Sequence, residues 1–262
     1  MRPDPAAATI DRLRAAGCVF AEDEARLLTA HAERSDELDA LVSRRVAGEP
    51  LEQILGWAEF CGLRIAVDPG VFVPRRRTEL LARQAIDRAR DGAVVVDLCC
   101  GSGAVGAVVM TALERIDLHA IDIDSAAARN ARRNLPDAAT VYVGDLDTPL
   151  PRRLHRRVDV LVANTPYVPT GEIDLMPPEA RVHEPRDALD GGADGLDIAR
   201  RVIAAAPRWL APGGSVLVET SERQAAALTE AVVASRLVPG IVRSKAVDAT
   251  VVIGTAPTAA AQ

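Results

Sequence analysis

The sequence predicts an α/β fold with a mostly parallel sheet, preceded by a small helical region. Three observations support this prediction. Short apolar strands alternate with helical patterns from residue 93 to residue 254, the apolar period before residue 57 is that of helices, and a glycine-rich turn joins the first strand of the alternating part to its first helix. Such alternation is typical of a parallel sheet with helices on both faces.

The alternating part contains seven predicted strands and three predicted helices. The strands are expected at residues 93–98, 118–123, 140–143, 158–163, 215–219, 238–243 and 250–253. The helices are expected at residues 104–113, 125–134 and 224–234. Residues 168–196 show little regular pattern, and a loop longer than about 15 residues in a compact domain is usually functional or disordered. Because this segment follows a strand end, where open α/β sheets bind ligands, we expect it to be a substrate-side loop.

The region before residue 92 is predicted to contain short helices and one β-hairpin. Ser35 is expected to cap the third of four helices and Thr78 to cap a linker helix that follows the hairpin. We expect four parts in all: helices over 1–56, the hairpin and linker helix over 57–91, the sheet domain over 92–254 and a flexible tail over 255–262.

The composition is that of a globular protein and argues against a nucleic-acid partner. The 262 residues are 48% hydrophobic and 26% charged, with a net charge of −6. An acidic chain offers no broad electropositive face for duplex binding. A basic run around His155, made by Arg152, Arg153, Arg156 and Arg157, is interpreted as a solvated face.

The sequence also predicts a cytoplasmic protein without a metal site. No apolar run approaches the roughly 18 residues of a spanning helix, and residues 1–8 lack the apolar core of a secretion signal. The four cysteines, at positions 18, 61, 99 and 100, do not have the C-x-x-C spacing of a zinc site. They are expected to be small buried thiols.

The glycine turn leaves two interpretations open. Gly101, Gly103 and Gly106 match the G-x-G-x-x-G pattern of dinucleotide binding, which would indicate an NAD-dependent oxidoreductase. However, that pattern begins almost directly after its strand, whereas here four residues from Asp97 onward intervene. In both interpretations the helix that follows directs unpaired N–H groups and a positive dipole end at an anionic ligand.

The pattern Asp-x-x-x-Gly-x-Gly, with an acid at the next strand end, instead favours S-adenosylmethionine. The loop would lie under the methionine part, Asp122 would hold the ribose hydroxyls, and Asp145 would meet the adenine amino group. The predicted cofactor-binding residues are Asp97, Cys99, Cys100, Gly101, Ser102, Gly103, Asp122, Asp145, Leu146 and Asn164.

The fourth strand ends in Asn164-Thr165-Pro166-Tyr167, which we predict to be the catalytic residues. An amide or exocyclic amine nitrogen is a poor nucleophile because its lone pair is delocalised. The Asn164 side-chain oxygen and a nearby backbone carbonyl can hold the two N–H groups and direct the lone pair at a methyl group, which is catalysis by positioning and electrostatics. Pro166 restricts the backbone, and Tyr167 can stack on a planar acceptor.

With these residues in view, the sequence resembles the class I S-adenosylmethionine-dependent methyltransferases, and more narrowly the N5-glutamine methyltransferases of peptide-chain release factors. The resemblance covers about residues 40–254. It rests also on flanking stretches: Arg45-Val46-Ala47-Gly48-Glu49-Pro50, Ile54-Leu55-Gly56, Glu59-Phe60-Cys61-Gly62-Leu63, Val67-Asp68-Pro69-Gly70-Val71-Phe72-Val73-Pro74-Arg75, and His183-Glu184-Pro185 with residues 188–196.

The resemblance implies a Rossmann-like class I methyltransferase domain over 92–254 and a helical substrate-side domain over 1–56. It implies an enzyme that uses S-adenosylmethionine to methylate the glutamine amide of the Gly-Gly-Gln motif in a release factor. By carry-over, Asn164 and the Thr165 carbonyl would hold that amide, with Tyr167 packed against it.

Three departures from the family pattern keep other acceptors open. Thr165 replaces the first proline of the usual Asn-Pro-Pro-Tyr. Cys99 replaces the glycine that the family has at the third place of the loop, counted from Asp97. Arg76 and Arg77 replace a proline and an acid. The alternatives are adenine N6 in nucleic acid, another protein, or a binding module that no longer catalyses transfer.

Overall fold

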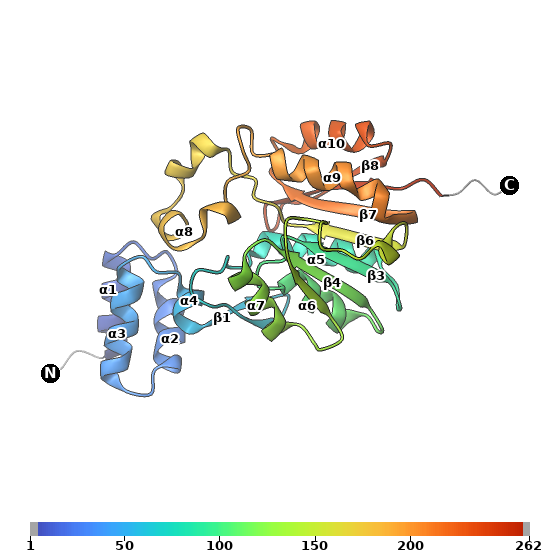
Figure 1. The fold of residues 1–262 in the computed structure, drawn as a ribbon. Coiled ribbons are helices and arrows are strands. Elements are labelled where there is room, and N and C mark those ends of the chain that lie inside the picture. Colours follow the sequence, from blue (N-terminus) through green and yellow to red (C-terminus); the bar gives the residue numbers. More distant parts are fainter. Residues whose placement is uncertain (1–4, 259–262) are drawn as a thin grey trace.

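The computed structural model describes residues 5–258, and its first part is a bundle of four helices. These helices are α1 (Pro5–Ala15), α2 (Ala21–His31), α3 (Ser35–Val46) and α4 (Leu51–Leu55). They enclose a small core of their own, in which Leu13, Leu28 and Val42 are fully buried. In Figure 1 this bundle lies to one side of the sheet. None of the helices within residues 5–258 combines the length and apolarity needed to cross a bilayer.

The hairpin joins the bundle to the sheet domain. It consists of β1 (Trp57–Phe60) and β2 (Leu63–Ala66), followed by the single-turn helix η1 (Arg76–Thr78) and by α5 (Glu79–Arg88). Phe60 and Ile65 belong to the same buried cluster as the sheet. The hairpin is therefore packed as part of the larger core, and the division of the chain into domains stays a prediction.

The sheet domain has the predicted seven strands in one mixed sheet. The strands are β3 (Val94–Leu98), β4 (Asp117–Asp122), β5 (Thr140–Val143), β6 (Val158–Ala163), β7 (Leu210–Thr220), β8 (Val238–Ser244) and β9 (Ala249–Thr255). Their spatial order is β5-β4-β3-β6-β7-β9-β8. β5 through β7 are parallel, and β9 is antiparallel to both of its neighbours. The carboxyl ends of five parallel strands therefore share one edge.

Helices cover both faces of this sheet, as predicted (Figure 1). The domain's helices are α6 (Ala104–Ala112), α7 (Ser125–Asn134), α9 (Asp197–Trp209) and α10 (Ala225–Ala234). Side chains of α5 and α6 pack on one face with Val95, and those of α9 and α10 pack on the other face with Val96. Successive strand residues point to opposite faces, so both faces of a central strand are buried.

The structure corrects several details of the prediction. Helix α9 was not predicted, although its buried residues Ala199, Val202, Ile203 and Ala206 follow helical spacing. Residues 168–196 contain the short helices η3 (Thr170–Leu175), α8 (Pro178–His183) and η4 (Arg186–Ala188). A single-turn helix η2 (Arg152–Leu154) precedes β6.

The two predicted caps are also wrong. The position before α3 is Arg34 rather than Ser35, and Thr78 makes no capping hydrogen bond to α5. Thr255 and Ala256, which were predicted to belong to a flexible tail, are ordered against the sheet: Thr255 closes β9, and Ala256 exchanges backbone hydrogen bonds with Gly213 and Gly214. The expectations for residues 1–4 and 259–262 lie outside the described residues.

Candidate active site

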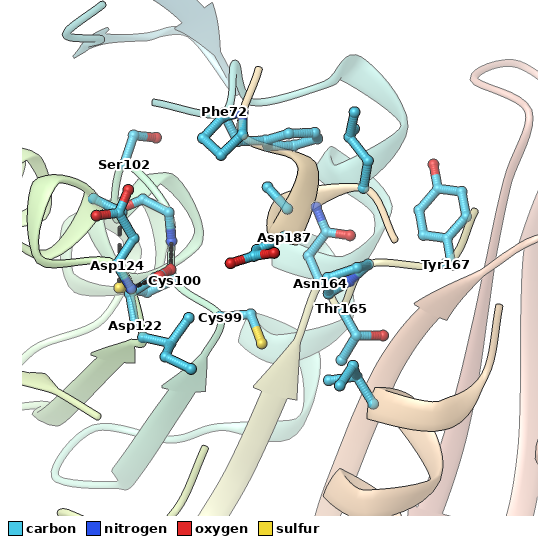
Figure 2. A pocket seen from close by; sticks show the side chains of 18 of the residues that line it. Phe72, Cys99, Cys100, Ser102, Asp122, Asp124, Asn164, Thr165, Tyr167 and Asp187 are labelled. Atoms are coloured by element: carbon cyan, nitrogen blue, oxygen red, sulfur yellow. Dashed lines mark hydrogen bonds between the residues drawn. The ribbon is translucent and has the colours of Figure 1, made fainter. Parts of the chain in front are cut away.

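A cavity of about 770 Å³ opens at the edge where the parallel strands end. This volume lies in the usual range for small-molecule sites. Almost all the residues predicted for the site line it, from Asp97 on β3 to Tyr167 beyond β6. Figure 2 shows Ser102 and Asp122 on one side and Asn164 and Tyr167 on the other. The structure thus brings together residues that lie 70 positions apart in the chain.

Gly103 is the exception, since it does not line the cavity. It precedes α6 with a φ of 77°, and a Cβ added there would approach Cβ of Ala131 on α7 to 3.1 Å. Its lack of a side chain allows α6 to begin close to α7, so Gly103 has a packing role. The cofactor-binding role predicted for Gly103 stays a prediction.

Backbone N–H groups of the loop between β3 and α6 hydrogen-bond to the end of β4 and fix the loop there. Gly101 N donates to the Asp122 carboxylate over 2.8 Å, and Cys100 N donates to the Ile121 carbonyl over 3.0 Å. Cys99 has a φ of 56°, in the left-handed region that favours glycine. Burial raises the pKa of the Cys99 thiol, so this side chain is a neutral wall of the cavity.

Asp97 and Gly106 explain why the glycine pattern resembles dinucleotide binding. Gly106 lies inside α6, where a Cβ would come within 2.7 Å of the Leu118 side chain, and its N–H donates to Asp97 over 3.2 Å. This third glycine therefore serves helix–strand packing. Burial raises the pKa of Asp97 to about 7, opposed by the Gly106 hydrogen bond.

Asp122 ends β4 with its carboxylate half occupied. One oxygen accepts from Gly101 N and the other from Asp124 N over 2.9 Å. Because a carboxylate oxygen has two lone pairs, each retains one for a ligand hydroxyl. Burial raises the pKa of Asp122, and the backbone hydrogen bonds oppose that shift. This geometry fits two adjacent ribose hydroxyls.

The next strand end supplies a polar and an apolar wall. Asp145, two residues beyond β5, pairs with Arg201 of α9 over 2.7 Å, and both side chains line the cavity. Leu146 has a φ of 49° and is buried. Ile123 lines the same region although its side chain is 63% exposed. A large apolar side chain left in the open beside a cavity is a ready surface for a planar base, and the sequence interpretation missed it.

Asn164 and Tyr167 form the opposite wall. The Asn164 side-chain nitrogen lies 3.4 Å from the Thr78 hydroxyl, and the Tyr167 hydroxyl accepts from Arg77 over 3.3 Å. Thr165 is 1% exposed, and its hydroxyl has no hydrogen-bond partner among residues 5–258. The side chain that replaces the family's proline thus buries a polar atom without satisfying it.

Thr78 and Glu219 at this wall were not predicted, whereas Arg77 was already singled out as a departure from the family pattern. Thr78 and Arg77 reach it from η1, and Glu219 lies behind it near the end of β7. Glu219 is 2% exposed, and burial raises its pKa to about 7. A signal for it was present, because Glu219 directly follows the apolar run Val216-Leu217-Val218 at the end of a parallel strand.

The segment 168–196 covers this wall and is anchored from both sides. The Glu184 carboxylate, whose side chain is fully buried, accepts from Arg75 at 2.6 and 2.7 Å and from Val73 N at 3.2 Å. A Cβ on Gly191 would meet the Pro166 carbonyl at 2.7 Å, so this glycine permits close packing on the strand-end turn. Asp187 points its carboxyl toward the middle of the cavity (Figure 2).

Other predicted features have simpler outcomes. The four basic residues around His155 are exposed, as expected of a solvated face. All four cysteines are unpaired. Cys100 is buried and Cys18, Cys61 and Cys99 are half-buried, so the expectation of buried thiols is fully met only by Cys100. Within residues 5–258, no group of three His, Cys, Asp or Glu side chains is placed to hold a metal ion.

Comparisons with known proteins first define the class of protein to which this chain belongs. Residues 62–238 match the model of the family described as methyltransferase small domain. A methyltransferase from Pyrococcus furiosus has a similar fold, with a TM-score of 0.55 and 17% identity over 82% of this chain and 97% of that one. The chain is therefore a methyltransferase, its cofactor is S-adenosylmethionine, and the NAD interpretation is set aside.

Three curated relatives narrow the class. Release factor glutamine methyltransferase of Geobacter sulfurreducens is 40% identical over 71% of this chain and 65% of its own length. That of Mycolicibacterium smegmatis is 35% identical over 84% of both chains. A 4-amino-L-phenylalanine/4-methylamino-L-phenylalanine methyltransferase of Streptomyces pristinaespiralis is 39% identical over 71% of this chain and 68% of its own. The chain belongs to the release factor glutamine methyltransferase family.

Proposed function

We propose that this protein transfers the methyl group of S-adenosylmethionine to the side-chain amide nitrogen of the glutamine in the Gly-Gly-Gln motif of a peptide-chain release factor. The observation that carries the proposal is the position of Asn164, across an open cavity from the glycine loop and Asp122. The cytoplasmic location expected from the sequence belongs to the same proposal.

In this proposal residues 99–103 would hold the methionine part of the cofactor, Asp122 would hold its ribose hydroxyls, and Ile123 and Leu146 would contact its adenine. Asp145, although paired with Arg201, keeps lone pairs for the adenine amino group. The cofactor supplies a methyl group on a positively charged sulfur.

The acceptor amide enters from the side of Tyr167. The Asn164 side-chain oxygen and the Thr165 carbonyl accept its two N–H groups, and Tyr167 packs against its plane. The nitrogen lone pair would then face the methyl carbon. The new C–N bond would form as the C–S bond breaks, S-adenosylhomocysteine would be the leaving group, and the nitrogen would release one proton to water. Positioning of this kind removes much of the barrier without a covalent intermediate.

The proposal is tested by incubating the protein with a release factor and S-adenosylmethionine that carries a labelled methyl group. We expect peptide mass spectrometry to place the label on the glutamine of Gly-Gly-Gln. A release factor with that glutamine changed to glutamate is the matched control and should take up no label. Labelling of a different residue, or of the control, would contradict the proposal.

A second candidate keeps the chemistry but changes the acceptor to a small aromatic amine that carries a carboxylate. The relative named for 4-amino-L-phenylalanine favours it. So does Arg77, which lines the cavity beside Tyr167 and forms no ion pair with any residue of 5–258. An aniline nitrogen, like an amide, has a delocalised lone pair. Competition between 4-amino-L-phenylalanine and the release factor for the labelled methyl group discriminates the two acceptors.

A further inference from the structure

Behind Asn164 three polar side chains lie in a row from three separate segments. Asn164 follows β6, Thr78 ends η1, and Glu219 lies near the end of β7. The Asn164 side-chain nitrogen donates to the Thr78 hydroxyl oxygen over 3.4 Å. The Thr78 hydroxyl also interacts with the buried Glu219 carboxyl, whose pKa it lowers against the effect of burial. Thr78 is 3% exposed and Glu219 is 2% exposed.

The hydrogen-bonding capacity of each group gives this row a direction. An ionised carboxylate only accepts, and a threonine hydroxyl has a single proton to donate. If that proton goes to Glu219, the Thr78 oxygen is left to accept, and only the nitrogen end of the Asn164 amide can satisfy it. The oxygen end of Asn164 is then the end that faces the cavity.

The opposite orientation of the Asn164 amide conflicts with Glu219. With its oxygen toward Thr78, Asn164 would compete for the one hydroxyl proton and leave the buried carboxylate without this donor. One carboxylate oxygen, Oε2, already has no hydrogen-bond partner among residues 5–258. A buried charge that loses a further hydrogen bond is strongly disfavoured, so the orientation follows from its partners.

We propose that Glu219 is a positioning residue, which acts through Thr78 to hold the Asn164 amide with its oxygen toward the acceptor. This deepens the proposed function and rests on it, because only an acceptor with N–H groups benefits from an oxygen at that place. A flipped Asn164 would present N–H groups to the N–H groups of the acceptor and would bind it poorly.

The charge on Glu219 controls the orientation of the Asn164 side-chain amide. Protonated Glu219 becomes a donor, so Thr78 can accept from it and give its own proton to the Asn164 oxygen. The ionisable groups that face this carboxyl in the described part of the chain are Arg77 on η1 and Tyr167 beyond β6. Its register partner on β9 is the apolar Val251. Burial raises the pKa of Glu219 to about 7, against the effects of Thr78 and Arg77.

The first test does not depend on the acceptor. Hydrogen exchange of the Asn164 side-chain amide is followed by NMR, with its signals identified by their loss in Asn164→Ala. We expect Thr78→Val to speed this exchange about tenfold or more and Thr78→Ser to restore it. Thr229→Val on α10, where the hydroxyl bonds to the Ala225 carbonyl outside the cavity, is the matched control. Unchanged exchange in Thr78→Val overturns the proposal.

The second test uses the methyl-transfer assay. Thr78→Val should lower kcat about tenfold or more while the KM for S-adenosylmethionine stays the same, and Thr78→Ser should recover most of the loss. Wild-type kcat should fall as the pH drops through about 7, and Glu219→Gln should lack this inflection because its amide does not titrate in this range. An inflection shared by both proteins overturns the proposal.

The two tests separate this inference from the function on which it rests. A wild-type protein that does not methylate the release factor contradicts the proposed acceptor, while the exchange measurement still decides the role of Thr78 and Glu219. If Thr78→Val does not fold, Glu219→Gln supplies the exchange comparison at pH 6 and pH 8. The exchange rate should depend on pH more strongly in wild type than in Glu219→Gln once intrinsic exchange is subtracted, and equal dependence overturns the proposal.

Discussion

The two halves of the cavity are built in different ways. The cofactor half consists of the 99–103 loop with Asp97, Asp122 and Asp145, and consecutive strand–helix units supply it. The acceptor half consists of Thr78, residues 164–167 and Glu219, and distant segments supply it. In the cofactor half, backbone N–H groups donate hydrogen bonds to the carboxylates of Asp97 and Asp122 and so fix their orientation. In the acceptor half, side chains orient other side chains.

This difference separates what is common to the class from what selects the acceptor. A site held by backbone geometry tolerates sequence change as long as the turn is kept, whereas a site held by side-chain pairs changes with each of them. All three departures from the family pattern touch the cavity or its rim, and two of them, Thr165 and the pair Arg76-Arg77, belong to the acceptor side. In this chain the acceptor half therefore carries most of the departures from the family pattern.

The largest expected effect is that of Asn164→Ala, which should impair the acceptor half and leave the cofactor half intact. Asn164→Ala should lower kcat by roughly 100- to 1,000-fold, the loss seen when one group that stabilises the reacting atoms is removed. Affinity for S-adenosylhomocysteine, measured by calorimetry, should change less than about threefold. A variant that keeps its turnover, or that loses the cofactor together with its activity, would contradict the separation.

Glu219→Gln tests the cost of the acceptor half to stability. Burial raises the pKa of Glu219 to about 7 in the folded protein, above the pKa of the same carboxyl group in the unfolded chain. The stability that the protonated group contributes is therefore complete below the unfolded-chain pKa and is lost as the pH rises through about 7. The free energy of unfolding of the glutamine variant, relative to wild type, should therefore increase by up to about 3 kcal/mol between pH 4.5 and pH 8. Urea unfolding at several pH values measures this difference. A difference that does not depend on pH would contradict a buried, titrating Glu219.

Asp122→Asn tests the cofactor half. The amide keeps one acceptor oxygen but loses the charge, so affinity for S-adenosylhomocysteine should fall about tenfold. Asp137→Asn, at an exposed position outside the cavity, is the matched control and should bind as wild type does. Equal affinity of the two variants would remove Asp122 from the ribose site.

The smallest expected effect concerns Thr165. Its buried hydroxyl has no hydrogen-bond partner within residues 5–258, and valine has nearly the same shape without that polar atom. Thr165→Val should raise the free energy of unfolding by about 1 kcal/mol. Thermal unfolding checks the prediction, and a destabilised variant would show that the hydroxyl is satisfied in solution.

The two halves also differ in how far the sequence predicts them. Asp97, the glycine loop and Asp122 lie within 26 residues of one another, and their spacing along alternating strands places them at one sheet edge. The seven strands and the hairpin were predicted for the same reason, because each depends on a local apolar period. Asn164 was found because it ends a strand in a recognisable turn.

Long-range contacts account for what the sequence did not predict. Thr78 meets Asn164 across 86 residues, and Arg75 meets Glu184 across 109 residues. No local period reports such pairs, so Thr78 was expected to cap a helix when its hydroxyl instead faces Asn164 and Glu219. Helix α9 was missed for a different reason, since its alanine-rich apolar face and Pro207 weaken an otherwise regular helical pattern.

The most direct measurement is a crystal structure of the protein with S-adenosylhomocysteine and a release factor. We expect the amide nitrogen of the Gly-Gly-Gln glutamine to donate to the Asn164 side-chain oxygen at about 2.9 Å, with the nitrogen facing the cofactor sulfur. A complex in which Asn164 turns away from the bound glutamine, or in which the glutamine lies outside this cavity, would contradict this expectation.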